Sequence, residues 1–306
     1  MKRMPQDLLP PRVFLSGVDA HQRIEDVLRE VGPQWREDLT HWGPWQETDP
    51  ISGIPGLCFA AAKPVASPVV VVPRCASSLD LLSRATAVLP PWGSVLAVHQ
   101  SAGRGQLRRR WWSQAGNILA AVRWPQPPAA LEPLLPLMIG LSLAGAFREL
   151  GVALAIKWPN DLVWQDRKVG GVLVEERSDC LAAGIGINLV QAPDASMLRD
   201  PWAYPATSLA ALGRYFRPLT LWQDLVNRAQ NWYMKNLCEQ TSSDLVALLH
   251  TFLAGWREQV RVLPTGQSPF TGVLSGIAPD GALRITTASG VATLSSGSYT
   301  LFPTTD

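Results

Sequence analysis

The sequence predicts an α+β protein in which a large domain of helices and strands precedes a small C-terminal β-barrel. Between residues 68 and 256, short β-branched runs alternate with stretches of helical periodicity. From residue 257 onward, short alternating runs are separated by turns such as Pro279-Asp280-Gly281, a pattern typical of a small barrel. A chain of 306 residues is long enough for one large domain and one small one.

Residues 1–65 have the least regular pattern, and we treat them as an N-terminal extension of unknown role. Within this extension, 13–15 fits a short strand and 20–31 fits a helix with one apolar face. The extension does not show two helices joined by a tight glycine-containing turn, which argues against a helix-turn-helix DNA reader. The predicted domains are therefore 1–65, 66–256 and 257–306.

The elements of the two remaining domains follow from local patterns. Strands are predicted at 69–72, 94–99, 118–123, 153–157, 162–165, 169–175 and 181–187, and in the barrel at 260–263, 270–274, 282–286, 291–294 and 299–302. Helices are predicted at 78–88, 134–150, 220–237 and 243–256. Ser77 or Ser78 would cap the first helix, and Thr220 with Gln223 would form a capping box for the third.

Composition limits the classes of function. A net charge of +2 is nearly balanced, whereas a protein that binds nucleic acid non-specifically usually has a stronger basic excess. The 4 cysteines lie far apart, so we expect free thiols in a reducing compartment, and the 4 histidines suggest no zinc site. We read no signal peptide and no apolar run near the ~20 residues that span a bilayer. We therefore expect a cytoplasmic protein without a membrane partner.

A glycine- and arginine-rich stretch from Gln100 to Trp111 follows the strand predicted at 94–99. Gly103 and Gly105 let backbone N–H groups approach an anion closely. Arg104 and Arg109 have the fork geometry that binds carboxylate or phosphate oxygens. The alternative is an exposed basic loop or a nucleic-acid contact. The Gly-x-Gly pattern alone would favour that alternative, because glycine-rich matches are common.

A second stretch, Lys157-Trp158-Pro159-Asn160-Asp161-Leu162, precedes Lys168-Val169-Gly170-Gly171. Proline sets a turn after a strand, which directs the next two side chains off the strand end. Asp161 is a hard oxygen ligand suited to hydrated Mg²⁺, and the two lysines supply charge for a phosphate or developing oxyanion. The alternative is two β-turns with solvated charges. We prefer it for Asp166 and Arg167, but not for Lys168 beside its paired glycines.

A third stretch, Gly184-Ile185-Gly186-Ile187-Asn188, has glycine at alternate positions of a predicted strand. Glycine weakens a strand, so this spacing indicates a close backbone or ligand approach. Asn188 at the strand end is suited to a hydrogen bond with a ligand.

Together, these stretches resemble the catalytic domain of bacterial biotin–protein ligases. That family carries a GRG(R/Q)xxRxW loop, a KWPNDL segment with a downstream lysine-glycine pair, and a GxGIN strand. The resemblance covers roughly residues 68–306 and includes Ser77-Ser78-Leu79-Asp80 and Ala206-Thr207-Ser208-Leu209. It implies a mixed-sheet, class II synthetase-like catalytic domain followed by an SH3-like barrel. Leu107-Arg108 and Ser78-Leu79 depart from the usual family residues.

The resemblance implies a role for each matching position. Its catalytic residues would be Lys168, Arg104, Asp161 and Arg109. Biotin would contact Ser77, Ser78, Leu79, Gln100, Gly103, Arg104, Gly105, Gln106, Trp111, Lys168, Gly171 and Gly184. The nucleotide would contact Arg104, Arg109, Trp111, Lys157, Asn160, Asp161, Lys168 and Asn188, with Asp161 also the candidate Mg²⁺ ligand.

The implied activity is ATP-dependent formation of biotinyl-5′-AMP and transfer of biotin to a lysine of a biotin carboxyl carrier domain. ATP and biotin would be substrates, no DNA partner is expected, and either a monomer or a homodimer fits the family. A lipoate- or octanoate-protein ligase of the same fold is the nearest alternative. The others are a non-catalytic regulator that binds biotin or nucleic acid, and a degenerate paralogue that adenylates poorly.

Overall fold

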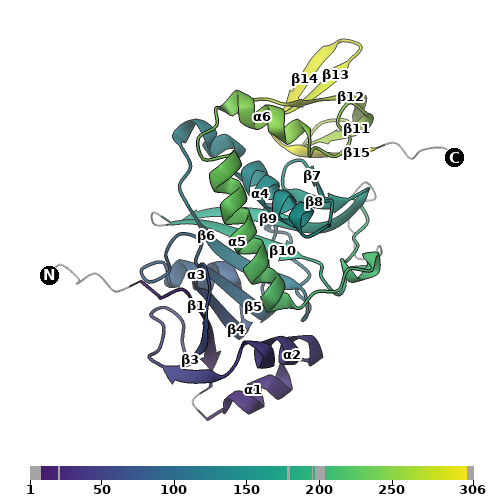
Figure 1. The fold of residues 1–306 in the computed structure, drawn as a ribbon. Coiled ribbons are helices and arrows are strands. Elements are labelled where there is room, and N and C mark those ends of the chain that lie inside the picture. Colours follow the sequence, from purple (N-terminus) through teal and green to yellow (C-terminus); the bar gives the residue numbers. More distant parts are fainter. Residues whose placement is uncertain (1–7, 20, 178–179, 195, 197–203, 302–306) are drawn as a thin grey trace. The chain divides into compact units, whose positions relative to one another are not determined.

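The structure is a computed structural model that describes residues 8–301, except 20, 178–179, 195 and 197–203. Strands β1 to β10 form one mixed sheet in the order β2-β3-β1-β4-β5-β6-β10-β9-β8-β7, and β11 to β15 form a five-stranded antiparallel sheet (Figure 1). The predicted α+β class with a separate C-terminal β-structure is confirmed.

The chain divides into two compact units, each assembled from separate stretches of sequence. The first contains Met1–Gln126, Leu173–Ala192 and Ser208–Asn227, and the second contains Pro127–Val172, Pro193–Thr207 and Arg228–Asp306. The domain division at residues 65 and 256 stays a prediction, and the two units are described separately below.

Seven strands of the first unit form a continuous ladder, which is parallel between β1, β4 and β5 and antiparallel elsewhere. Their bounds are β1 Arg12–Val18, β2 Trp45–Thr48, β3 Leu57–Pro64, β4 Val69–Cys75, β5 Ser94–Gln100, β6 Ile118–Trp124 and β10 Cys180–Ile187. The predicted strands at 69–72, 94–99, 118–123 and 181–187 are confirmed.

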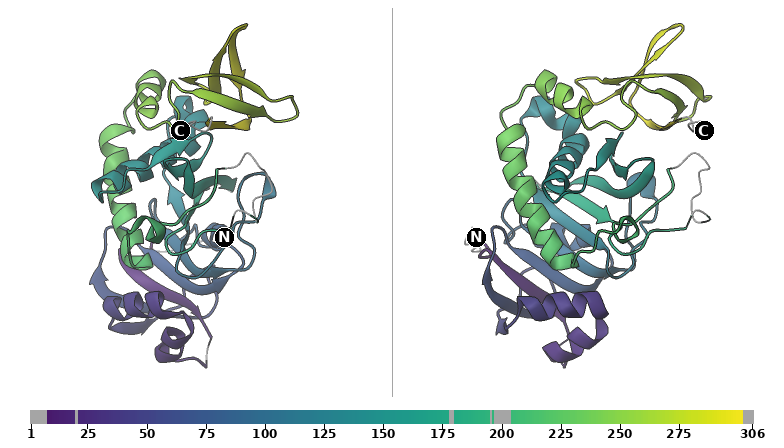
Figure 2. Two further views of the ribbon diagram at one scale, coloured as in Figure 1. Left: turned by 90° about the vertical axis from the view of Figure 1, so that its right-hand side faces the viewer. Right: turned by 45° about the vertical axis from the view of Figure 1, so that its right-hand side comes forward.

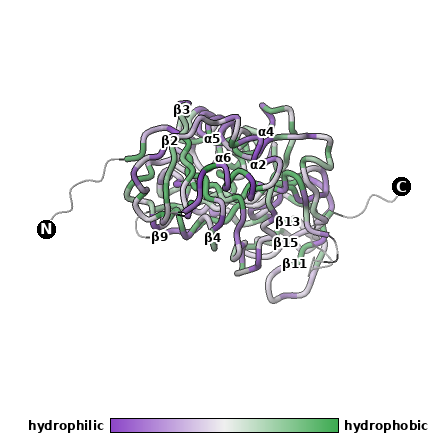
Figure 3. The backbone as a smooth tube through the Cα atoms, turned by 90° about the horizontal axis from the view of Figure 1, so that it is seen from below, coloured by the Kyte–Doolittle hydropathy of each residue, from purple (hydrophilic) through white to green (hydrophobic). Residues whose placement is uncertain are grey.

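The centre of this ladder is apolar because its strands are covered on both faces. All four valines at 69–72 are at most 1% exposed. In Figure 3 the tube is green at the β4 label, the colour of hydrophobic residues. Helix α3, Ser78–Arg84, packs on β5, β6 and β10, and its buried leucines join the same core as Val70 and Leu119. The packing of α3 on β5, β6 and β10 thus fixes the position of Ser77 and Ser78 at the start of this helix.

The N-terminal extension is more regular than its sequence suggested. The strand predicted at 13–15 is β1, and the helix predicted at 20–31 is the shorter α1, Ile24–Glu30. Residue 20 lies outside the described residues. Helix α2, Pro33–Trp42, was not predicted; it begins with proline, which suits the first helical turn. Strand β1 lies between β3 and β4, and α2 packs against β3 (Figure 2). The extension therefore continues the sheet of the first unit.

Helix α5, Pro218–Asn236, begins two residues before the predicted capping box, so the box prediction was wrong. Its first N–H groups are satisfied from another helix. Asp38 of α2 accepts hydrogen bonds from the backbone N–H groups of Leu219 (2.6 Å) and Thr220 (3.0 Å) and from the Thr220 hydroxyl (2.6 Å). A sequence window cannot reveal a cap that comes from a residue so distant in the chain.

An Asp38→Ala variant is expected to lose about 2–4 kcal/mol of unfolding free energy, because Asp38 is 0% exposed and its removal leaves buried donors unpaired. Urea denaturation measures the loss. The matched control is Glu37→Ala, whose side chain is 73% exposed and lies 3.8 Å from Arg217, so its expected loss is below ~1 kcal/mol. Equal midpoints for the two variants would contradict this account of the cap.

The second unit has a buried helix beside short strands. Its elements are the 3₁₀ turn η2 Ala129–Leu134, α4 Leu135–Glu149, β7 Ala155–Lys157 and β8 Asp161–Trp164, while β9 Arg167–Arg177 contributes residues to both units. The span Ala129–Glu149 is long and apolar enough to cross a membrane, but 78% of its apolar 18-residue window is buried in the fold. It is therefore a core helix. The predicted strands at 153–157, 162–165 and 169–175 are confirmed with shifted ends.

The C-terminal sheet contains β11 Gln259–Pro264, β12 Phe270–Ile277, β13 Leu283–Thr287, β14 Gly290–Leu294 and β15 Gly297–Leu301. All five predicted barrel strands are present, although residue 302 lies outside the described residues. The buried Tyr299 hydroxyl donates a hydrogen bond to the Ala254 carbonyl (2.7 Å), which fixes β15 to the segment before β11. Helix α6, Ser242–His250, ends earlier than predicted and is capped by Thr241.

Candidate active site

The segment after β4 is rigid and buried. Ser77 is the N-cap residue of α3, and Ser77 and Ser78 are 2% and 3% exposed. The backbone N–H of Ser78 donates to Gln100 Oε1 (2.7 Å), and Gln100 Nε2 lies 3.4 Å from Ser113 Oγ. These contacts bring three of the predicted biotin-binding residues together in the first unit. Buried polar groups held in this way can recognise a ligand with little reorganisation.

The glycine- and arginine-rich stretch forms a narrow hairpin-like loop. Its two arms are joined by hydrogen bonds from Gly105 N to Arg109 O (2.7 Å) and from Trp111 N to Gly103 O (2.9 Å). Residues Gln106–Arg108 form the 3₁₀ turn η1 at the tip, where Leu107 is 78% exposed at φ 55°. The loop thus presents an exposed tip, while Gly103 lies against Ser113 with no room for a Cβ.

The two alternate glycines of β10 are covered by side chains of the neighbouring site segments. A Cβ on Gly184 would lie 2.8 Å from Leu79 Cδ1, and a Cβ on Gly186 would lie 2.3 Å from Trp111 Cε2. The sequence predicted a close approach by backbone or by a ligand, whereas the atoms that approach these glycines belong to protein side chains. Leu79 and Trp111 therefore lie side by side over this strand, together with the glycines that the sequence assigned to the site.

The Arg104 guanidinium is engaged by protein carboxylates. It forms hydrogen bonds with Asp80 at 3.1 and 2.7 Å and with Glu175 at 2.9 and 3.2 Å. These two acids hold the Arg104 pKa above its ordinary value through hydrogen bonding and charge. Sequence reasoning included Asp80 only as part of a matched segment and missed Glu175, and the predicted contact of Arg104 with a ligand stays a prediction. The Arg109 side chain is exposed and forms no ion pair with any described residue.

In the second unit, Lys168 and Asp161 form the central pair. Lys168 Nζ lies 2.6 Å from Asp161 Oδ1, with both side chains partly exposed. Asp161 begins β8 and pairs in register with Gly171 of β9. Lys168 is fixed further by backbone hydrogen bonds with Pro205 and Thr207. The KWPNDL segment and the lysine-glycine pair are thus brought together, as their sequence assignment to one site requires.

Two other predicted nucleotide contacts face protein groups. Lys157 is 4% exposed, and its Nζ donates to Ser298 Oγ (2.9 Å) and lies 4.6 Å from the Tyr204 ring centre. Asn160 Nδ2 donates to the Val172 carbonyl (2.5 Å) and closes the turn between β7 and β8 onto β9. The nucleotide contacts of Lys157 and Asn160 therefore stay predictions.

A further residue that sequence reasoning missed orders the chain after β10. Asn117 Oδ1 accepts hydrogen bonds from the backbone N–H groups of Leu189 (3.0 Å), Val190 (3.0 Å) and Gln191 (3.2 Å). Asn188, 3% exposed, accepts one from Leu209 N (2.9 Å) through its backbone carbonyl. The end of β10 is therefore held on both sides. The only sequence signal for Asn117 is the turn-forming dipeptide Gly116-Asn117.

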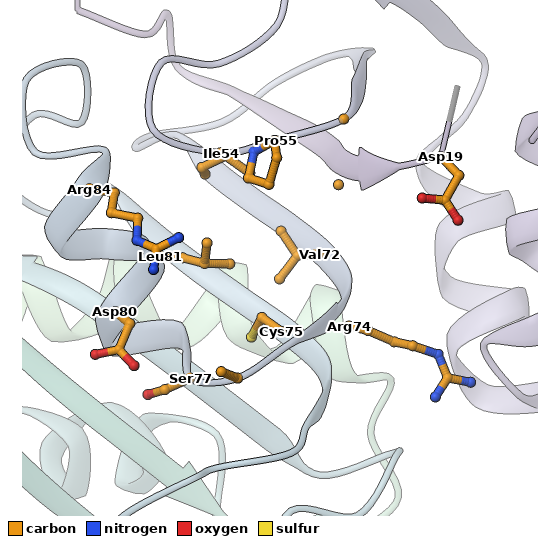
Figure 4. Close-up of a pocket in the computed structure, with 13 residues that line it drawn as sticks. Asp19, Ile54, Pro55, Val72, Arg74, Cys75, Ser77, Asp80, Leu81 and Arg84 are labelled. Atoms are coloured by element: carbon orange, nitrogen blue, oxygen red, sulfur yellow. The ribbon is translucent and has the colours of Figure 1, made fainter. Parts of the chain in front are cut away.

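A cavity of about 250 Å³ lies beside α3 (Figure 4). Of the predicted biotin-binding residues it includes only Ser77, and the rest of its lining includes Asp19, Arg74, Cys75 and Arg84. Burial, with the charge of Asp80, raises the pKa of Cys75 to about 12, so this thiol is protonated at neutral pH and is no nucleophile. Because Ser77 is its one lining residue that the sequence assigned to biotin, this cavity does not coincide with the predicted biotin site.

The described residues do not fit a resident metal ion. They include no group of three or more His, Cys, Asp or Glu side chains placed to hold one. The candidate ligand Asp161 already bonds the Lys168 ammonium. A single carboxylate with a cationic partner is a poor preformed magnesium site.

Comparison with known proteins identifies the family to which this fold and these motifs belong. Residues 80–190 match the Biotin/lipoate A/B protein ligase family. The biotin–[acetyl-CoA-carboxylase] ligase of Mycobacterium tuberculosis is 31% identical over 241 residues, covering 74% of this chain and 86% of that protein. The chain belongs to the biotin–protein ligase family.

Two further comparisons agree. The biotin–[acetyl-CoA-carboxylase] ligase of Paracoccus denitrificans is 40% identical over 127 residues, which is 38% of this chain and 51% of that protein. This aligned part thus spans about half of that relative. The solved biotin protein ligase of Aquifex aeolicus in complex with biotin and ATP matches with a TM-score of 0.63 at 27% identity, covering 76% of this chain and 98% of that one.

Proposed function

We propose that this chain is an ATP-dependent biotin–protein ligase that forms biotinyl-5′-AMP and then biotinylates a lysine of a biotin carboxyl carrier domain. The observation that carries the proposal is the Lys168–Asp161 pair, formed by the KWPNDL segment and the lysine-glycine pair. An ammonium held by one carboxylate keeps further N–H donors for the oxygens of a substrate. The family membership supports biotin as the acid.

The first half-reaction activates the carboxylate, which is a poor acyl donor. A biotin carboxylate oxygen attacks the α-phosphorus of ATP, the P–O bond to the β-phosphate breaks, and pyrophosphate leaves with the electron pair. Lys168 stabilises the negative charge that spreads over the phosphate oxygens. Positioning of the two substrates supplies much of the remaining rate gain. Mg²⁺ enters with the phosphates of ATP, as part of the substrate.

The second half-reaction transfers the acyl group. The ε-amine of the acceptor lysine attacks the biotinyl carbonyl, AMP leaves, and the amine loses a proton to solvent. The family resemblance assigns the loop of residues 103–111 to shielding of the mixed anhydride, which limits its hydrolysis, and offers Arg109 as a cationic side chain for the phosphate. No covalent enzyme intermediate is required, in agreement with the protonated Cys75. We expect a cytoplasmic enzyme without a DNA partner, as a monomer or homodimer.

The choice of acid separates this proposal from its nearest alternative. The purified protein is incubated with ATP, a biotin carboxyl carrier domain or a lipoyl domain, and either biotin, lipoate or octanoate. We expect a mass increase of one biotinyl group on the carrier domain only with biotin. Lipoylation or octanoylation of the lipoyl domain, without biotinylation, would replace the proposal with the lipoate-type alternative.

A further inference from the structure

Arg104 lies at the centre of an ion cluster with Asp80 and Glu175, at the base of the 103–111 loop. The guanidinium has five N–H donors, and four of them bond the carboxylates of Asp80 and Glu175. All three side chains are partly buried, with 25%, 31% and 20% of their surfaces exposed. Paired hydrogen bonds from the guanidinium to both carboxylates fix the direction of its plane as well as its position.

The charges of this cluster disfavour an anionic ligand at Arg104. One guanidinium and two carboxylates carry a formal net charge of −1. A biotin carboxylate or a phosphate approaching Arg104 would meet that excess negative charge, and it would have to displace an existing partner to gain more than one hydrogen bond. In the first unit, the exposed Arg109 has no such competitors among the described residues.

The cluster also connects three segments that sequence separates widely. Arg104 begins the loop whose arms meet at Gly105 and Arg109. Asp80 lies in the first turn of α3, just after Ser77 and Ser78, and Glu175 lies on β9. In Figure 4 the Asp80 carboxylate points away from Val72 and Cys75, and it accepts hydrogen bonds from Arg104. A fixed guanidinium therefore ties the base of the loop to the helix that carries the buried serines.

We propose that Asp80 and Glu175 are positioning residues that anchor the base of the 103–111 loop through Arg104, and that Arg104 is part of this anchor and does not bind the reacting phosphate. The consequence for catalysis rests on the proposed function. The anchor itself is a property of the folded chain and is tested without substrates.

The test is limited trypsin digestion of the full chain, with cleavage after the exposed Arg109 and Arg110 mapped by mass spectrometry. The Asp80→Asn/Glu175→Gln double variant is expected to be cleaved there about tenfold faster than the parent, because local opening controls proteolysis. The matched control is Glu176→Gln, which removes one exposed acid beside Glu175 and should leave the cleavage rate unchanged. Thermal melts confirm that each variant is folded, and the single variants replace the double one if it is not.

A double-mutant cycle shows whether the acids act through Arg104. Asp80→Asn should accelerate cleavage in the parent and add nothing in an Arg104→Gln background, because the partner is already lost. For the ligase, the acid variants should raise the biotin KM about tenfold and change kcat of adenylation by less than about threefold. Unchanged cleavage in the folded acid variants, or an undiminished Asp80→Asn effect without Arg104, would overturn the anchor. Lack of adenylation by the parent would overturn only the proposed function.

Discussion

A Lys168→Ala variant is expected to form biotinyl-AMP at least ~10²-fold more slowly than the parent, the scale for loss of one positioned electrostatic group. In the structure the ammonium is held by Asp161 at 2.6 Å and the backbone is fixed by Pro205 and Thr207, so its charge is in place before substrates arrive. Alanine removes the positive charge and, with it, the ion pair to Asp161. Single-turnover formation of the adenylate measures the loss.

The matched control for this prediction is Lys235→Ala, which removes an exposed lysine of the same unit. It should retain the parent rate, and thermal melts should show both variants folded. An Asp161→Asn variant should fall between the two, because the ammonium keeps its charge and loses its ionic partner. If Lys168→Ala released pyrophosphate at the parent rate, Lys168 would have no part in adenylation.

A Gly186→Ala variant is expected to weaken biotin binding by roughly 5- to 150-fold, the equivalent of 1–3 kcal/mol of overpacking. The new Cβ would lie 2.3 Å from the Trp111 ring, so the ring must leave its place over β10. Trp111 closes the loop through its hydrogen bond to Gly103, and displacement of the ring disturbs the loop that we assign to biotin. Titration calorimetry with biotin measures the change.

The matched control is Gly140→Ala in α4, where a Cβ meets only Ile156 atoms at 3.8 Å. Alanine is favoured over glycine in a helix, so this variant should keep its biotin affinity and gain a little stability. Biotin affinity in Gly186→Ala equal to that of the parent would show that the Trp111 position is unimportant for the ligand.

Local pattern was sufficient for the elements that carry the motifs. The valine run of β4, the alternate glycines of β10 and the turn at Pro159 each have a short-range cause, and their elements lie where predicted. Within residues 8–64 the sequence predicted β1 and α1, but α2, β2 and β3 were missed because α2 and β2 are short and β3 lies among residues rich in Trp, Pro and Gly. Strand β3 pairs with both β1 and β2, and a local pattern does not reveal such pairing.

The limits of sequence reasoning lie in long-range polar contacts. Asp38 caps a helix that begins 180 residues later in the chain, so the local Thr220–Gln223 pattern was misleading. Arg104 was assigned to a ligand because nothing near it in sequence indicates Asp80 and Glu175 as its partners. The contact of Lys157 with Ser298 of β15 was likewise not evident from the sequence, and its nucleotide role stays a prediction. In each case the charge of the residue was evident and its partner was not.

Biotin-dependent exchange of labelled pyrophosphate into ATP shows whether this chain activates biotin as an acyl adenylate. We expect exchange by the purified protein that requires biotin, persists in Lys235→Ala and falls at least ~10²-fold in Lys168→Ala. Absence of biotin-dependent exchange by the folded parent protein would contradict this activation.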